Sequence, residues 1–273
     1  MNEEYIDNVK HLIEQKDADK VKGLLIDLHP ADIAELCNDL NAEEAKFVYR
    51  LLDNEIAADV LVEMDEDAEE MLITGFSDNE LKEVIDELYV DDAVDLVEEM
   101  PANVVKRILQ QADPEMRKMI NEILKYPDDS AGSIMTTEYV SLRPNMTAEE
   151  AIKRIRRVGV DKETIYTCYV TQNRVLLGVV TVKTLLLSPY ETKIKDIMET
   201  NVISVTTHED KEDVAQMFSK YDLSALPVVD GENRLVGIIT FDDAMDVMEE
   251  EATEDFEKMA AILPGDKPYL KTG

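Results

Sequence analysis

The first half of the chain carries apolar residues in two registers, each repeating every twelve residues. The first register consists of Leu28, Leu40, Leu52, Met64, Phe76, Leu88, Met100, Ala112 and Leu124. The second register consists of Leu36, Val48, Val60, Leu72, Val84, Leu96, Ile108 and Ile120. Helix N-cap residues follow several members of the first register, namely Asn41, Asp53, Asp65, Ser77 and Asp113. Each period therefore predicts one short helix and a tight turn, and residues 1–126 are expected to form a helical superhelix.

A different pattern begins after a segment rich in Pro, Asp, Ser and Gly, which predicts a linker over residues 127–133. Beyond it, Ser133–Ile152 matches Asp196–Ala215 at an offset of 63 residues. Thr167–Leu186 likewise matches Ala225–Ala244, with Gly178 aligned to Gly237. Each copy predicts the order β-α-β-β-α, with two alternating strands flanking a turn. We call residues 134–190 the first repeat and residues 191–246 the second repeat.

The charge balance limits the classes of partner. The chain has 61 Asp and Glu against 28 Lys and Arg, a formal net charge of -33. Such a surface repels phosphate backbones, which argues against nucleic acid, and it attracts cations. Two cysteines imply no disulfide framework. The longest apolar stretch, residues 175–187, is interrupted by Lys183 and is shorter than the roughly 20 residues of a spanning helix. This chain alone is therefore expected to be soluble.

The duplicated unit resembles a pair of CBS domains. The segments that carry the resemblance are "IMTTEYVSL", "IMETNVISV", "LPVVD" and "GIITFDD". With the superhelix before it and "DDAMDVMEEEATEDF" after it, the chain is similar to the cytosolic part of MgtE-type magnesium transporters and channels. The fold class expected from the resemblance is α+β: an all-α superhelix, an α/β CBS-domain pair and a long C-terminal connecting helix.

The same resemblance implies an assembly at the membrane. The connecting helix is expected over residues 242–263. The tail 264–273 is expected to lead to the protein's own transmembrane pore domain, which is absent from this chain. The location implied is the cytoplasmic face of the cell membrane, with a homodimer formed through the CBS units.

Acidic residues are the candidate chemistry. Asp91 and Asp95 lie one helical turn apart, so their carboxylates share a face although like charges there are unfavourable. Any single acidic residue in this chain is more simply explained as part of a solvated surface. Grouped carboxylates without imidazole or thiolate partners instead favour a hard cation such as Mg²⁺. Distant acidic faces could then meet only with cations between them.

The resemblance implies a particular magnesium ligand set. It places side-chain ligands on the superhelix, the second repeat and the connecting helix, and one carbonyl ligand at Ser219. The side-chain ligands are Asp59, Asp91, Asp95, Asp210, Glu212, Asp222, Asp243 and Glu254. The expected function is a Mg²⁺-sensing regulatory region that closes the pore when Mg²⁺ bridges these acidic faces.

Nucleotide binding is the main alternative, because CBS units often sense adenosine nucleotides. By resemblance, an ATP site would involve Tyr166, Lys183 and Leu223, but Thr184 stands where an Asp is expected. That difference argues against ATP at this site. The alternative function is an adenosine-nucleotide-sensing CBS module of another transporter or enzyme; a helical-repeat adaptor that docks a basic protein is a further one. No catalytic constellation is visible in the sequence, so we expect no enzyme activity.

Overall fold

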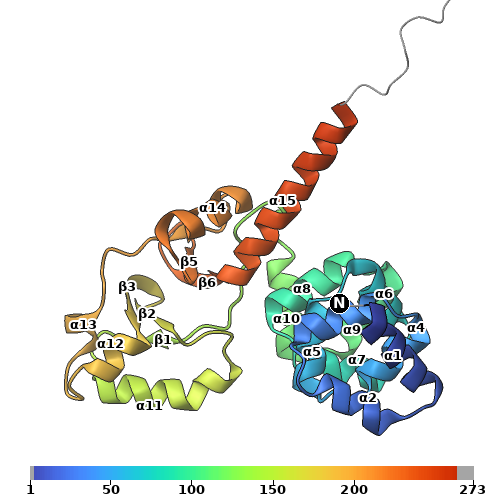
Figure 1. Cartoon of the computed structure of the whole chain (residues 1–273). Coiled ribbons are helices and arrows are strands. Elements are labelled where there is room, and N and C mark those ends of the chain that lie inside the picture. Colours follow the sequence, from blue (N-terminus) through green and yellow to red (C-terminus); the bar gives the residue numbers. More distant parts are fainter. Residues whose placement is uncertain (1–2, 263–273) are drawn as a thin grey trace, which may run out of the picture. The chain divides into compact units, whose positions relative to one another are not determined.

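The computed structural model describes the backbone of residues 3–262 and the side chains of residues 5–253 and 256. The predicted tail 264–273 lies outside these residues. The chain forms two compact units, Met1–Glu122 and Ile123–Gly273, which we call the helical unit and the α/β unit (Figure 1). Within the described part of the chain, no helix combines the length and the apolar composition needed to cross a bilayer.

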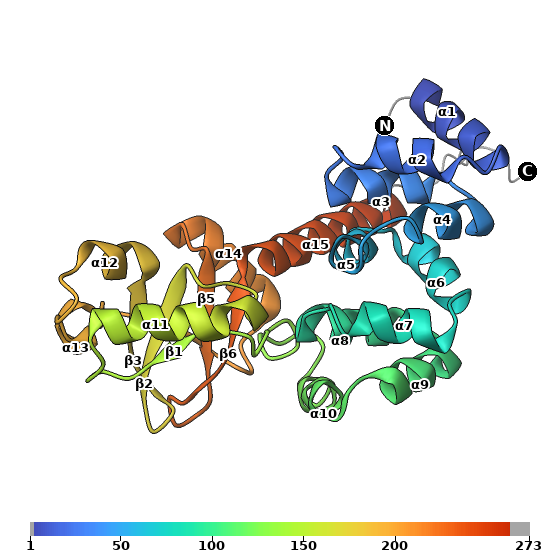
Figure 2. The same ribbon diagram turned by 90° about the horizontal axis from the view of Figure 1, so that it is seen from below.

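The described part of the helical unit is a series of short helices, and those from α2 to α10 begin at intervals of twelve residues. The bounds are α1 Glu3–Glu14, α2 Ala18–Leu25, α3 Pro30–Asn38, α4 Ala42–Tyr49, α5 Asn54–Val62, α6 Glu66–Thr74, α7 Asp78–Ile85, α8 Val90–Glu99, α9 Ala102–Gln111 and α10 Pro114–Ile123. Several pack against the helix two positions further along, as α3 does on α5 and α7 on α9 (Figure 2). The predicted one-helix period is therefore confirmed.

The two apolar registers play different parts in this unit. Every member of the second register is buried, because its residues lie within the helices. Members of the first register lie at or just after the helix ends, where Leu28, Leu52, Met64 and Leu124 are only partly buried. Asn41, Ser77 and Asp113 accept backbone hydrogen bonds as caps. Asp53 and Asp65 occupy N-cap positions but make no side-chain cap bond.

The α/β unit contains two small sheets. The first has the order β1-β2-β3, with β1 Ser141–Leu142, β2 Thr167–Gln172 and β3 Val175–Thr181. The second has the order β4-β5-β6, with β4 Val205–Thr206, β5 Ala225–Val229 and β6 Leu235–Thr240. The remaining elements are α11 Ala148–Val158, a 3₁₀ turn Gly159–Asp161, α12 Val182–Leu187, α13 Ile194–Ile197, α14 Lys211–Tyr221 and α15 Phe241–Ile262. In both sheets the first pairing is parallel and the second antiparallel.

The two repeats exchange their leading segments. Thr136, at the start of the first repeat, pairs through both backbone hydrogen bonds with Ile238 of the second repeat. Glu199, at the start of the second repeat, pairs in the same way with Val179 of the first. The regular strands β1 and β4 are only two residues long. The leading residues of each repeat thus pair with the last strand of the sheet in the other repeat.

Two matched glycines make the exchange possible. A Cβ at Gly178 would lie 2.6 Å from the carbonyl oxygen of Glu199, and a Cβ at Gly237 would lie 2.8 Å from that of Thr136. Neither glycine has a positive φ, so the requirement is for space and not for an unusual backbone conformation. The alignment of these glycines in the sequence therefore has a packing cause.

The segment 127–133, predicted to be a linker, is bound to the second repeat. The amide of Ala131 donates to the Glu209 carbonyl at 2.7 Å, and that of Gly132 donates to the Thr207 carbonyl at 3.0 Å. Ala131 is fully buried in the core that also holds Val205 and Phe218. The segment is consequently part of the folded α/β unit.

Helix α15 has a double role. Its first turns pack into the core of the second repeat, where Ala244 and Val247 are buried. From there the helix continues to Ile262, for 22 residues in all. At 1.5 Å per residue this corresponds to a length of about 33 Å. The predicted connecting helix is therefore continuous with the repeat.

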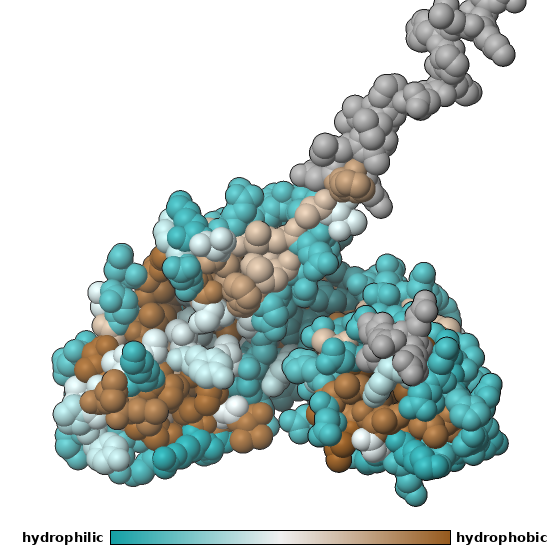
Figure 3. Space-filling view, in the orientation of Figure 1, coloured by the Kyte–Doolittle hydropathy of each residue, from teal (hydrophilic) through white to brown (hydrophobic). Residues whose placement is uncertain are grey.

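Apolar side chains are exposed on the first repeat. Val160, Tyr166, Leu186, Leu187 and Tyr190 each expose more than 60% of their surface. Figure 3 shows hydrophobic side chains gathered over α12, the helix that carries Leu186 and Leu187. An exposed apolar patch of this kind is typical of a surface that is covered in an assembly.

Candidate metal centre

The helical unit carries three of the predicted ligands. Asp59 lies on α5 and is exposed. Asp91 lies in the first turn of α8, and Asp95 follows one turn later with an exposed side chain. Burial raises the pKa of Asp59, Glu55 raises it further, and His29 partly opposes both.

A fourth acidic residue of the helical unit was not predicted. Glu69, on α6, is only 6% exposed although the sequence places it among other acids. Burial raises the pKa of Glu69, and the charge and hydrogen bond of Glu99 raise it further. The charges of Asp95 and Glu66 act in the same direction. Only its burial beside the acids of α8 distinguishes this glutamate from its exposed neighbours.

In the second repeat, the predicted ligands lie at opposite ends of α14. Asp210 is the N-cap, and its Oδ1 accepts from the amides of Glu212 at 3.0 Å and Asp213 at 3.3 Å. Asp222 is the C-cap and adopts a left-handed conformation with φ 51°. Ser219 lies in the last turn. Because an eleven-residue helix is about 16 Å long, the two ends cannot share one ion.

Lys211, the first residue of α14, makes an ion pair with a residue of α15. Lys211 Nζ is 3.4 Å from Glu250 Oε2, which joins the start of α14 to α15.

Asp243 begins α15 and is held by the residue that ends β6. Its Oδ2 accepts a hydrogen bond from the Thr240 hydroxyl and another from the Thr240 amide at 3.2 Å. Burial raises the pKa of Asp243 to about 6, although the Thr240 hydrogen bonds lower it; Asp242 and Asp246 raise it further. The carboxylate is thus fixed in place and surrounded by negative charge.

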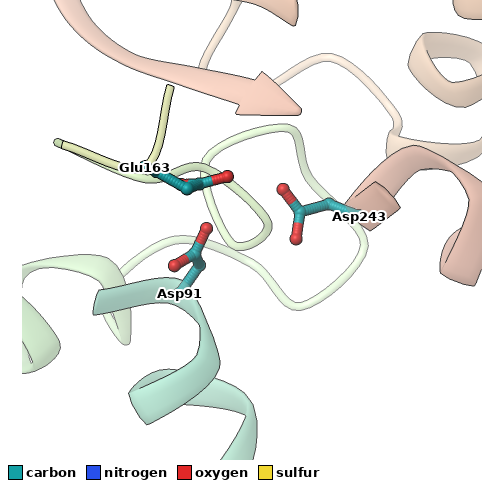
Figure 4. Close-up of side chains that lie close together, drawn as sticks. All are labelled: Asp91, Glu163 and Asp243. Carbon is teal, nitrogen blue, oxygen red and sulfur yellow. The ribbon is translucent and has the colours of Figure 1, made fainter. Parts of the chain in front are cut away.

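Glu163 lies beside Asp243 and was not predicted. The two carboxylates have oxygens within 4.8 Å of each other and point toward one another (Figure 4). Both side chains are partly buried. Glu163 comes from the segment before β2 of the first repeat, so two repeats supply the pair. No periodicity or motif in the sequence connects this segment with the start of α15.

A buried hydroxyl lies in the same part of the α/β unit. Tyr169 on β2 is fully buried, and its hydroxyl has no hydrogen-bond partner among the described residues. Burial raises the pKa of Tyr169, and the charges of Cys168, Glu163 and Tyr139 add to this effect. A buried polar atom without a protein partner commonly holds an ordered water molecule.

The donor chemistry of the Glu163 and Asp243 pair fits Mg²⁺. Two carboxylates about 5 Å apart repel each other by roughly 3 kcal/mol at an effective dielectric constant near 20. Mg²⁺ prefers one or two carboxylates and retains several waters. Glu254 lies on α15, but its side chain is outside the described residues.

The residues predicted for a nucleotide lie mainly on the first repeat. The Tyr166 carbonyl accepts from the Val182 amide at 3.0 Å, so Tyr166 and Lys183 are close along the backbone, and both side chains are exposed. Leu223 instead packs against the core of the second repeat. Thr184 donates its amide to Thr181 Oγ1 at 3.1 Å, with the two hydroxyls 3.0 Å apart. This turn supplies hydroxyl groups but no carboxylate.

Family models match both units of the chain. The model described as "MgtE intracellular N domain" matches residues 28–129, and the model described as "CBS domain" matches residues 131–190 and 194–250. The magnesium transporter MgtE of Thermus thermophilus is 35% identical over 278 residues, which include 100% of this chain. The match covers 62% of that transporter, so the chain spans about three fifths of its length.

Two solved structures are similar over most of the chain. A crystal structure of the cytosolic domain of the Mg²⁺ channel MgtE in complex with ATP has a TM-score of 0.83 and 34% identity. That match covers 89% of this chain and 99% of the other. A crystal structure of the soluble part of a magnesium transporter has a TM-score of 0.82 and 32% identity, covering 92% and 99%.

Proposed function

Because the chain belongs to the MgtE family, in which an intracellular N domain precedes a CBS pair, we propose that it is the Mg²⁺-sensing regulatory region of a magnesium transporter or channel. The observation that carries this proposal is the pair of converging carboxylates, Glu163 and Asp243, at the base of α15. A helix of 22 residues that begins beside this carboxylate pair is suited to transmit binding to a pore. The region works by binding ions and carries out no catalysis.

The ligand set for closure combines three parts of the chain. The helical unit supplies Asp59, Asp91 and Asp95. The second repeat supplies Asp210, Glu212, Asp222 and Asp243, together with the Ser219 carbonyl, and α15 supplies Glu254. At low Mg²⁺ the acidic faces repel each other and the connecting helices separate; at high Mg²⁺ the ions bridge the faces and the pore closes.

Several ions must act together for this switch. One site at ten times its Kd favours the closed state by only about 1.4 kcal/mol. A change from mostly open to mostly closed requires about 5.5 kcal/mol. The separation of Asp210 from Asp222 along α14 supports more than one site, because one ion cannot reach both ends of that helix.

The proposed assembly is a homodimer formed through the CBS units at the cytoplasmic face of the membrane. The exposed side chains of Leu186, Leu187 and Tyr190 support a contact with a second copy on the first repeat. The C-terminal end of α15 would lead to the transmembrane pore domain.

Nucleotide sensing is the second candidate, because one similar structure contains ATP. Against it, Thr184 provides no carboxylate for ribose hydroxyls, and Leu223 is packed in the core of the other repeat. Isothermal titration with Mg²⁺, ATP and AMP separates the two functions. We expect Mg²⁺ to bind at several sites and the nucleotides to bind weakly; strong nucleotide binding without a Mg²⁺ response would overturn the proposal.

A further inference from the structure

The helical unit contains a cavity lined by residues that the predicted ligand set does not include. Its volume is about 280 Å³, and its walls come from α4, α5, α7 and the turns that precede α5 and α7. The apolar part of the wall consists of Leu52, Ala57, Val84, Tyr49 and Phe76. Clefts that hold drug-sized ligands usually measure about 300–1,000 Å³, so this smaller one is better matched to a single large side chain.

Contacts among the lining residues fix the walls of the cavity. The Tyr49 hydroxyl donates to the Ala57 carbonyl at 2.7 Å, which joins α4 to α5. The rings of Tyr49 and Phe76 lie 5.2 Å apart, which joins α4 to the turn before α7. Walls that are already ordered lose little conformational entropy when a side chain enters, and this favours binding.

The rim of the cavity carries an excess of negative charge. Arg50 Nε donates to Glu80 Oε1 at 2.6 Å, so the charges of these two lining residues offset each other. Glu83 also lines the cavity and is exposed, and it makes no ion pair among the described residues. The net charge of -33 on the chain adds to the attraction for a cation. The charge of the rim therefore complements a basic partner.

We propose that this cavity binds a segment of another protein in which one large apolar side chain is flanked by lysine or arginine. The apolar side chain enters the cavity, and a basic neighbour pairs with Glu83 at the rim. Single apolar anchors in such pockets supply much of the binding energy of many protein interfaces. The inference goes beyond the proposed Mg²⁺-sensing function, because it concerns a second kind of partner and uses none of the predicted metal ligands.

Short peptides with this chemistry are the probes. The full 273-residue chain, isotope-labelled for NMR, is titrated with the capped peptides GKFKG, GKLKG and GKWKG. We expect each to shift the backbone amides of the cavity residues on α5 and α7. GKAKG lacks the apolar anchor and should bind about tenfold more weakly or worse. GEFEG keeps the anchor but reverses the flanking charges, so it should also bind more weakly than GKFKG.

Two variants test the cavity and its rim separately. Ala57→Leu places a larger side chain in the cavity and should weaken GKFKG binding about tenfold or more. Glu83→Gln removes the rim charge and should weaken it about two- to fivefold, as expected for an exposed ion pair. Glu43→Gln is the matched control, because it removes an exposed charge of α4 that does not line the cavity, and it should behave like the wild type.

The peptide comparison on the wild-type chain decides the inference even if Ala57→Leu fails to fold. If GKFKG, GKLKG and GKWKG all leave the amides of α5 and α7 unshifted, or if GKAKG binds as well as GKFKG, no side chain is held in the cavity and the inference is wrong. If GEFEG binds as well as GKFKG, the assignment of a basic partner is wrong. Each of these results leaves the proposed function standing, because that function is tested by titration with Mg²⁺.

Discussion

The two repeats share one backbone plan but differ in the side chain that contacts the threonine at the end of their last strand. After β3, Thr181 caps the next helix and contacts Thr184; after β6, Thr240 stands in the same place and contacts Asp243. The first turn therefore presents hydroxyl groups and no carboxylate, whereas the second presents a fixed carboxylate. The two turns share the same capping threonine, and only the second carries the carboxylate that we propose as a cation ligand.

The largest expected effect is a loss of stability at the two glycines that the repeats share, Gly178 and Gly237. Gly178→Ala and Gly237→Ala place a Cβ against the exchanged leading segments, so each should destabilise the α/β unit by about 1–3 kcal/mol. Gly178→Ala should cost more, because its Cβ would lie 2.6 Å from the backbone oxygen of Glu199, whereas the backbone oxygen nearest Gly237 is that of Thr136 at 2.8 Å. Urea denaturation measures both.

Gly231→Ala is the control for these variants, because a Cβ at this position would meet open space. It should change the free energy of unfolding little. Equal losses in all three variants would mean that close packing of the exchanged segments does not limit stability, and the shared plan would need another explanation.

The second prediction removes the difference between the repeats. Asp243→Thr gives the second repeat the turn of the first, so it should weaken Mg²⁺ binding by about ten- to a hundredfold. Isothermal titration measures the change. Asp196→Asn, an exposed charge removed elsewhere in the second repeat, serves as the control. Unchanged Mg²⁺ binding in Asp243→Thr would show that this carboxylate is not a ligand.

The third prediction concerns the reverse substitution, in the first repeat. Thr184→Asp gives the first repeat a carboxylate next to Thr181, in the position that would hold ribose hydroxyls. Because a hydrogen bond to a charged group contributes about 1.5–3 kcal/mol, ATP affinity should rise about tenfold or more. Thr184→Asn, which has nearly the same shape without the charge, is the comparison. Tight ATP binding by the wild-type chain would contradict this assignment.

The fourth and smallest effect concerns pH. The folded-state pKa of Asp243 is raised to about 6, so the folded protein retains a proton that the unfolded chain has already lost. Without divalent ions, the contribution of Asp243 to stability should therefore be fully present below about pH 4 and be lost as the pH rises through about 6. The first repeat has no titrating group at Thr184, and Asp243→Thr should remove this part of the slope.

Melting temperatures at about pH 4.5 and pH 7.5 in chelator provide the measurement for this titration. Wild-type protein should lose more stability between the two pH values than Asp243→Thr does. Parallel slopes for the two proteins would show that Asp243 has an ordinary pKa in the folded state.

The helical period was predictable because it is local. Twelve-residue spacing of apolar residues and the caps Asn41 and Ser77 determine short helices from neighbouring residues alone. The exchange of leading segments was not predictable, because pairing of Thr136 with Ile238 joins residues about a hundred positions apart. The matched glycines signalled a packing constraint without showing which segment imposes it.

The candidate site was predictable only where its residues lie in local sequence motifs. Asp243 stands in a recognisable turn, whereas Glu163 has no local signal and becomes a candidate only through the contact between repeats. Glu69 is similar, since only packing separates a buried acid from its exposed neighbours. The division of the predicted ligands between the two ends of α14 also required the helix bounds.

Small-angle scattering of the full chain over a Mg²⁺ titration tests the central claim most directly. If cations hold the acidic surfaces together, the radius of gyration should fall with added Mg²⁺ along a steep, multi-site curve and rise again with chelator. Asp91→Ala and Asp243→Ala should shift the transition to higher Mg²⁺. A radius of gyration that stays the same after complete chelation would contradict the account.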